Sequence, residues 1–267
     1  MDTASVRRHL REIRSAMRVV AAVLTTLLLT ALRTGRPSAP APETPVATAR
    51  SLVVLVHGFG AGTDCWDATV GALGGPGVAV VTHRYTWTSS VPTLGAQLAD
   101  EVASLVRRSG ARSVTLVGHS LGGVLVAASL ADGRLDRLIE RTATQVVTVA
   151  APLRGTRWAR LFPVGAVRGL RAGLAPVARP GHVPWLAVAS RADVVVGVPS
   201  AVPEGSEPVV VDGVGHCGLL KDADVIARIA AVVDAGRRER GLRARRGVRC
   251  TPGPATAKPA GALTLVG

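Results

Sequence analysis

Aromatic side chains are scarce in this chain: four Trp, two Phe and one Tyr make up 3% of its 267 residues. A nucleic-acid-binding domain combines a basic stripe with interleaved aromatic residues, and the aromatic part of that pattern is missing. Lysine is also rare, with two Lys beside 30 Arg. We attribute this skew to nucleotide composition and draw no functional conclusion from it. The composition therefore predicts no nucleic-acid partner.

Cysteine is scarce as well, since the chain contains only Cys65, Cys217 and Cys250. Three thiols allow at most one internal disulfide, which is consistent with an exported protein and leaves one thiol unpaired. The spacing of the three residues fits no zinc-site pattern, so we predict no structural metal.

The net charge of +14 is concentrated at the two ends of the chain. Residues 1–36 contain seven Arg and two acidic residues, and residues 237–267 contain eight Arg or Lys and one acidic residue, which leaves +2 for the residues between them. Residues 237–267 begin with an Arg run and continue with a segment rich in Pro, Ala and Gly. We interpret them as a basic, disordered tail.

The N-terminal end has the pattern of an export signal. Basic residues precede the uncharged run Val19–Leu32, whose 14 residues match the apolar part of a signal peptide. A membrane span needs ~20 residues. We therefore predict that residues 1–36 are an export signal, or an uncleaved signal anchor, and that the protein is secreted or extracytoplasmic. Residues 37–49, rich in Pro and Ala, form a linker.

Six short apolar runs follow the linker, and helix-like segments alternate with them. Such runs are typical of strands buried on both faces of a parallel sheet. Residues 94–106 place their leucine and valine side chains on one helical face, and we expect Gly110 to end this helix. The alternation predicts an α/β fold over residues 50–236, with a mostly parallel sheet of about six strands and helices on both faces. The runs are 51–56, 78–83, 113–118, 145–150, 185–190 and 208–213.

Residues 153–184 interrupt this alternation. They contain six Arg and no acidic residue, with leucine and valine side chains at intervals of mostly three or four residues. Two interpretations stay open: a surface crossover with solvated arginines, or a lid that covers the site and contacts a lipid interface.

The pentapeptide Gly118-His119-Ser120-Leu121-Gly122 has the pattern G-x-S-x-G between a predicted strand and a predicted helix. A sharp turn in this context strains the serine backbone and projects its hydroxyl above the carboxyl edge of the sheet. A serine hydroxyl is a weak nucleophile unless a base and an orienting acid accompany it. Ser120 is therefore the candidate nucleophile, provided that both partners exist.

His216 is the candidate base, because it follows the last predicted strand and precedes a helix, at the same sheet edge as Ser120. The other histidines lie in the export signal, in the loop after the first strand, at a strand end, in the elbow and in the crossover: His9, His57, His83, His119 and His182.

Asp193 is the candidate acid. It follows the penultimate strand and lies between Ser120 and His216 in the chain, which is the Ser, Asp, His order of this kind of fold. Its carboxylate would accept the Nδ1 proton of His216 and orient Nε2 toward Ser120. Asp212, at the end of the last strand, is the alternative acid. Asp222 and Asp224 directly precede the helix-like segment 225–233, so we expect them at the N-terminal turn of the last helix instead.

Two backbone amides are expected to bind the oxyanion. One belongs to Leu121, the residue after the nucleophile, and the other to Phe59 in the loop HGFGAG after the first strand. That loop lacks the pattern G-x-G-x-x-G, so a dinucleotide site is rejected. Cys65 and Cys217 follow loops at the same edge, and a disulfide between them is considered.

Four segments together resemble known proteins: VVLVHGFGAG, VTLVGHSLGGV, SRADVVV and DGVGHCGLL. They look like segments of the α/β-hydrolase fold lipases, most closely the small secreted bacterial lipases of lipase class 2, over about residues 51–235. The resemblance implies triad roles for Ser120, Asp193 and His216 and oxyanion roles for Phe59 and Leu121. APLRGT (151–156) is similar to a segment of larger lid-bearing triacylglycerol lipases.

The resemblance implies hydrolysis of carboxylic esters, often lipid esters, through an acyl-enzyme and with no cofactor. We expect a monomer. If the segment 153–184 is a lid, a lipid interface would be a further partner, contacted through that segment and the N-terminal apolar run. Two alternatives stay open: an acyltransferase that uses the same triad, and a catalytically silent binding protein on the same fold.

Overall fold

The computed structural model describes four stretches of the chain: residues 45–160, 165–171, 183–203 and 207–245. The predicted export signal (1–36), most of the linker and the tail beyond residue 245 lie outside them. Within the described stretches, no helix combines the length and the hydropathy needed to cross a membrane.

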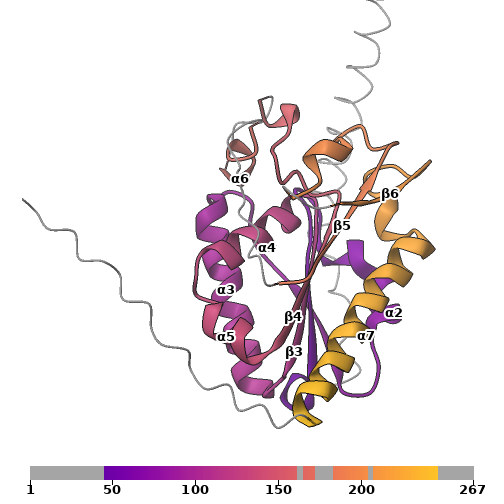
Figure 1. The fold of residues 1–267 in the computed structure, drawn as a ribbon. Coiled ribbons are helices and arrows are strands. Elements are labelled where there is room, and N and C mark those ends of the chain that lie inside the picture. The colour runs from indigo at the N-terminus through magenta and orange to yellow at the C-terminus, as the bar shows by residue number, and fades with distance from the viewer. Residues whose placement is uncertain (1–44, 161–164, 172–182, 204–206, 246–267) are drawn as a thin grey trace, which may run out of the picture.

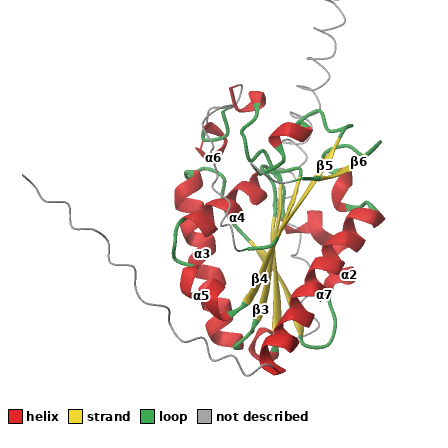
Figure 2. Ribbon diagram, in the orientation of Figure 1, coloured by secondary structure: helices red, strands yellow, loops and turns green. Residues whose placement is uncertain are grey.

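Six parallel strands form one sheet in the order β2-β1-β3-β4-β5-β6 (Figures 1 and 2). This confirms the α/β-hydrolase fold with about six strands that the sequence predicts. The strands are β1 (Ser51–Val56), β2 (Val78–His83), β3 (Ser113–His119), β4 (Ala143–Val149), β5 (Trp185–Ser190) and β6 (Val209–Val211).

Helices cover both faces of the sheet, as predicted (Figure 1). On one face lie α3 (Val91–Ser109), α4 (Leu121–Ala131) and α5 (Asp136–Arg141), and on the other lie α2 (Asp67–Leu73) and α7 (Ala223–Arg245). The shorter elements are α6 (Gly165–Arg168) and the 3-10 turns η1 (Val46–Thr48), η2 (Thr63–Trp66), η3 (Arg157–Arg160), η4 (Val198–Ser200) and η5 (Gly218–Leu220).

Strand β1 shows how the apolar runs serve two cores. Successive side chains of a strand point to opposite faces. Leu52, Val54 and Val56 accordingly join the core beneath α3 and α4, whereas Val53 and Leu55 join the core beneath α7. All five side chains are buried. A strand buried on both faces cannot alternate apolar and polar residues, and this explains its continuous apolar sequence.

Helix boundaries follow local signals where those signals exist. Ser90 caps α3 by accepting the N–H of Thr93 at 3.3 Å, and Gly110, in the left-handed region at φ 66°, ends the helix. Helix α7 continues to Arg245, so the first nine residues of the segment assigned to the tail, 237–245, are helical. Residues 237–245 are highly charged, but most of them are Arg, Glu, Ala or Leu, which are good helix formers.

The order of the strands defines where a site is expected. From β1 the chain passes to β2 on one side and later crosses to β3 on the other side of β1. The connections that leave the carboxyl ends of these two neighbouring strands therefore run in opposite directions along the sheet. Ligands of open α/β sheets bind at such a switch point. The loop HGFGAG follows β1 and the G-x-S-x-G turn follows β3. The fold therefore brings these two motifs side by side.

Candidate active site

Ser120 lies in the turn between β3 and α4, with its backbone at φ 52° and ψ −124°. A positive φ is rare for a residue that has a side chain, and such strain concentrates at functional sites. The N–H of Ser120 donates to the carbonyl of Val149 at 2.9 Å, and its own carbonyl accepts the N–H of Gly123 at 3.0 Å. The neighbouring backbone thus holds the strained residue from both sides.

The glycines beside Ser120 are required by close backbone contacts. A Cβ on Gly122 would overlap the carbonyl groups of Val56 and His57, at the end of β1. A Cβ on Gly118 would lie 2.5 Å from the Cα of Gly123. Side chains at these two positions would push the elbow away from the strands that support it.

The loop after β1 packs directly against the nucleophile turn. A Cβ on Gly58 would lie 3.0 Å from the Cβ of Ser120 and 3.1 Å from Nδ1 of His119. Phe59 comes next, and its ring packs edge to face on Trp87, with ring centres 4.8 Å apart. Leu121 is the first residue of α4, where amide groups have no acceptor inside the helix. Both predicted oxyanion donors therefore belong to segments that adjoin Ser120.

Tyr85 supports this loop, and the sequence analysis missed it. Its hydroxyl donates to the carbonyl of His57 at 2.8 Å, and its ring stacks on the His57 ring with centres 4.4 Å apart. The ring N–H at Nδ1 of His57 donates to the carbonyl of Gly58 at 2.9 Å. Burial raises the pKa of Tyr85 and lowers that of His57, so both side chains are neutral supports. The available signal was a single tyrosine, two residues after β2.

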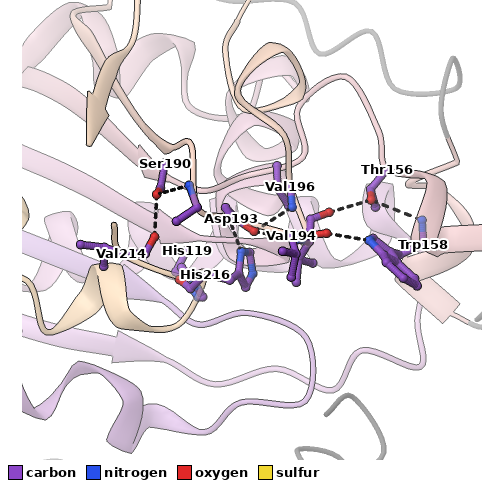
Figure 3. A network of polar contacts seen from close by, with 11 residues as sticks. His119, Thr156, Trp158, Ser190, Asp193, Val194, Val196, Val214 and His216 are labelled. Carbon is purple, nitrogen blue, oxygen red and sulfur yellow. Dashed lines mark hydrogen bonds and ion pairs between the residues drawn. The ribbon is translucent and has the colours of Figure 1, made fainter. Parts of the chain in front are cut away.

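Asp193 and His216 are in direct contact (Figure 3). Nδ1 of His216 donates to Oδ2 of Asp193 at 2.7 Å, and the Asp193 side chain is fully buried while that of His216 is 13% exposed. The other oxygen, Oδ1, accepts the N–H groups of Val195 at 2.8 Å and Val196 at 2.9 Å. This tautomer leaves Nε2 of His216 as the nitrogen that can accept a proton.

The surroundings of Asp193 favour its ionised form. Burial alone would raise the pKa of this carboxyl, but the hydrogen bond and charge of His216, together with the amides of Val196 and Val195, outweigh it. The pKa of Asp193 therefore lies below its ordinary value. An ionised carboxylate fits the orienting role, because it can only accept hydrogen bonds.

The alternative acids are engaged elsewhere. Asp212 is exposed and forms an ion pair with Arg191, whose guanidinium lies 2.9 Å from Oδ1. Asp222 accepts the amides of Asp224 and Val225 at 3.1 and 3.0 Å, at the start of α7. Asp224 lies in the first turn of that helix.

His119 connects the nucleophile turn to the base. Its Nε2 donates to the backbone carbonyl of His216 at 3.2 Å, and the two ring centres are 4.8 Å apart. Burial, followed by the charge of His216, lowers the pKa of His119 to about 3. Nδ1 of His119 is buried without a hydrogen-bond partner among the described residues. His119 is therefore a neutral donor, a role that sequence analysis did not assign.

Two of the remaining histidines, His57 and His83, lie in the described residues. His83 contacts Glu101 at 2.5 Å, and His9 and His182 lie outside the described residues. In the described part of the chain, no hydrogen bond joins Oγ of Ser120 to His216. Catalytic hydrogen bonds of this type commonly tighten only when substrate binds.

The cysteines do not form the disulfide considered above, because Cys65 and Cys217 are both free thiols. Burial, with the nearby Asp64, raises the pKa of Cys65 to about 12, and burial also raises that of Cys217. Cys250 lies outside the described residues. Within those residues, no group of three or more His, Cys, Asp or Glu side chains is placed to hold a metal ion.

Comparisons with known proteins agree with the fold. A sequence model of the alpha/beta hydrolase family matches residues 53–203. The solved structure of Bacillus licheniformis lipase BlEst2 in mature form is 16% identical, with a TM-score of 0.58 over 74% of this chain and 96% of that one. Est1E from Butyrivibrio proteoclasticus is also 16% identical, with a TM-score of 0.52 over 76% and 92%.

A curated relative adds sequence similarity over a shorter stretch. Abhydrolase domain-containing protein abhd-5.2 from Caenorhabditis elegans is 32% identical over 92 residues, which are 31% of this chain and 20% of that protein. The chain thus matches about a fifth of that relative's length. The family match covers more than half of the chain, and the strand order and elbow described above fit it. The chain belongs to the alpha/beta hydrolase family.

Proposed function

We propose that this protein is a serine hydrolase that cleaves carboxylic esters through an acyl-enzyme, with Ser120, His216 and Asp193 as its triad. One observation carries the proposal. A buried carboxylate orients His216 at 2.7 Å, and His119, the residue before the strained Ser120, holds the carbonyl of that same histidine. A base, its orienting acid and a serine elbow thus meet at one sheet edge.

The chemistry follows from these groups. Nε2 of His216 takes the proton of Ser120 while Oγ attacks the ester carbonyl, and the carbonyl oxygen becomes an oxyanion. The N–H groups of Phe59 and Leu121 stabilise that oxyanion. His216 then protonates the leaving alcohol. A water molecule, deprotonated by the same nitrogen, attacks the acyl-enzyme. His216 then returns this proton to Oγ of Ser120 as the bond to the acyl group breaks, which releases the carboxylic acid and the free serine.

Asp193 keeps one geometry through both half-reactions. Its Oδ2 accepts the Nδ1 proton of His216, so the imidazole presents Nε2 to the reacting atoms. When His216 becomes positively charged, the buried carboxylate stabilises it without taking the proton. The amides of Val195 and Val196 occupy the other oxygen and prevent the carboxylate from rotating.

Acyl or lipid esters are the substrate class that we propose. The resemblance to small class 2 lipases supports it. The solved structure of lipase BlEst2 is only 16% identical, so it supports the fold and not the substrate class.

The test is hydrolysis of p-nitrophenyl esters of increasing chain length by the wild type and by Ser120→Ala. We expect kcat to fall roughly 10⁴-fold or more in the variant, because the nucleophile is removed. Ser129→Ala is the matched control: this buried serine of α4 donates only to the carbonyl of Val126, at 2.7 Å, and its loss should leave the rate unchanged. Equal rates for wild type and Ser120→Ala would refute the proposal. Product analysis with an added alcohol identifies the acyl acceptor.

A further inference from the structure

Two surface segments, far apart in the sequence, are joined by hydrogen bonds beside the triad. We define the crossover turn as residues 154–158 and the acid loop as residues 193–200. The N–H of Arg154 donates to the carbonyl of Ser200 at 3.1 Å, and the Ser200 hydroxyl donates back to the carbonyl of Gly155. The crossover turn is the start of the Arg-rich segment 153–184, whose role the proposed mechanism does not use.

Two side chains of the crossover turn reach the backbone directly after the catalytic acid (Figure 3). The indole N–H of Trp158 donates to the carbonyl of Val194 at 3.0 Å. The hydroxyl of Thr156 donates to the carbonyl of Val195 at 3.1 Å and accepts the N–H of Trp158 at 3.4 Å. The two donors therefore support each other as well as the acid loop.

The accepting carbonyls belong to the peptide groups that hold the carboxylate of Asp193. The carbonyl of Val194 and the N–H of Val195 form one peptide group, and this N–H donates to Oδ1 of Asp193. The carbonyl of Val195 and the N–H of Val196 form the next group, which donates to the same oxygen. Because a peptide group is planar, a donor bound at its carbonyl also sets the direction of its N–H.

Apolar packing holds one part of the acid loop and not the other: Val195 and Val196 belong to a small apolar cluster with Ala189, Val198 and Ala201, whereas Val194 lies outside it. The side chain of Val194 is 64% exposed, so burial contributes little to holding this residue. Hydrogen bonds in a chain also polarise one another, and a carbonyl that accepts a donor makes the N–H of its peptide group a stronger donor. The peptide group of Val194 and Val195 is therefore the one whose position depends most on the hydrogen bonds from the crossover turn.

We infer that Thr156 and Trp158 are positioning residues for Asp193, and that the crossover turn serves the proposed triad by holding the two peptide groups that orient the Asp193 carboxylate. We call these hydrogen bonds from Thr156 and Trp158 the clamp. The inference rests on the proposed triad. Neither residue touches the reacting atoms. Their effect reaches Ser120 through Asp193 and His216, and it concerns the rate of the chemical step more than substrate binding.

The experiment uses two variants of the full chain, each of which lacks one hydrogen-bond donor, and a soluble ester, p-nitrophenyl butyrate. Trp158→Phe removes the indole N–H but keeps an aromatic ring, and Thr156→Val removes the hydroxyl. Each should lower kcat about three- to tenfold, the effect of one lost hydrogen bond, with KM within about twofold of the wild type. The acidic limb of the kcat/KM profile should move to lower pH, because a protonated His216 loses part of its carboxylate partner.

Two control variants separate positioning from general stability. Thr156→Ser keeps the hydroxyl and should keep the wild-type rate. Trp185→Phe removes an indole N–H that donates to Thr148 at 3.0 Å, at the other end of β5 from the acid loop. It should lower the melting temperature as Trp158→Phe does, while kcat and the pH profile stay unchanged.

A measurement that needs no substrate separates a failure of this inference from a failure of the proposed ester hydrolysis. The Nδ1 proton of His216, shared with Asp193, gives a downfield NMR signal that should shift or broaden in Trp158→Phe and stay unchanged in Trp185→Phe. An inactive wild type that shows this response refutes the ester hydrolase and supports the clamp. An unchanged signal and unchanged kcat in folded Trp158→Phe and Thr156→Val, or equal losses in Trp185→Phe, would overturn the clamp.

Discussion

The two sides of the candidate active site are built by different means. On the nucleophile side, the loop after β1 and the elbow after β3 pack backbone against backbone, with glycines at the contacts and a strained Ser120 between them. On the acid and base side, the loops after β5 and β6 are joined by hydrogen bonds from side chains, with Asp193 and His216 at the centre. We call the nucleophile side, which depends on close backbone packing, the steric side. We call the acid and base side, which depends on side-chain hydrogen bonds, the polar side.

The strands beneath the two sides differ in the same way. Strands β1, β3 and β4 lie in the middle of the sheet and are buried along their whole length. Strand β6, at the edge, has three residues, all of them only half-buried. A short edge strand supplies little packing to its loop. The contrast concerns the loop of His216, which follows β6, because β5, the strand before Asp193, is buried over its last four residues.

The largest expected effect breaks the steric side. Gly122→Ala places a methyl group against the carbonyls of Val56 and His57, and we expect a loss of about 3 kcal/mol or more in unfolding free energy, with loss of activity. Gly71→Ala is the control, because nothing lies within 4 Å of its Cβ position in α2. It should stabilise the protein by about 0.5 to 1 kcal/mol. Urea denaturation compares them, and two variants of equal stability would contradict the steric account.

A smaller effect tests the polar side. The hydroxyl of Ser190 donates to the carbonyl of Val214 at 2.5 Å and accepts the N–H of Ala192 at 3.1 Å, which joins the loops of acid and base. Ser190→Ala should cost about 1 kcal/mol of stability and lower kcat about tenfold.

Ser109 offers a matched control at the opposite end of the sheet. Its hydroxyl also donates to a carbonyl, that of Leu105 at 2.8 Å, and accepts the N–H of Ala111 at 3.1 Å. Ser109→Ala should lose similar stability and keep full activity. A kcat that falls equally in both variants would show that the network has no specific link to catalysis.

The last effect depends on pH and concerns His119, where the two sides meet. Its pKa, about 3 in the folded protein against 6.5 for an ordinary histidine, is lowered by burial first and by the charge of His216 next. Between these values the unfolded state binds a proton that the folded state does not, so stability rises with pH across this window. The slope attributable to His119 approaches ~1.4 kcal/mol per pH unit.

His119→Gln should remove that slope while it keeps a donor for the carbonyl of His216. Urea denaturation at a series of pH values from about 3.5 to 7 measures it. Aspartates with lowered pKa values, such as Asp193, lose their stabilising contribution only at the acidic end of this window. Identical slopes in the variant and the wild type would mean that His119 is not neutral in the fold.

Sequence patterns predicted the steric side better than the polar one. Continuous apolar runs indicated the strands, and the glycines around Ser120 indicated a close backbone contact. These signals are local, since a buried strand or a tight turn restricts the residues at its own positions. The order of Ser120, Asp193 and His216 along the chain suggested their meeting only because the parallel topology brings strand ends to one edge.

The supports of the polar side could not be predicted in this way. Thr156 and Trp158 bind carbonyls 39 and 36 residues away. The same holds on the nucleophile side for Tyr85, whose hydroxyl binds a carbonyl 28 residues away. A backbone carbonyl accepts a donor whatever its side chain, so the acceptor leaves no trace in the sequence. Short helices such as α5 were missed because six residues are too few to show a periodicity.

The most direct measurement is the site of covalent labelling by a fluorophosphonate, followed by intact mass and peptide mapping. An activated serine attacks this probe, whereas an ordinary hydroxyl does not. We predict one adduct per chain, on Ser120, no adduct in Ser120→Ala, and strongly slowed labelling in His216→Ala. A folded protein that stays unlabelled, or that is labelled at another residue, would contradict the assignment of Ser120 as the nucleophile.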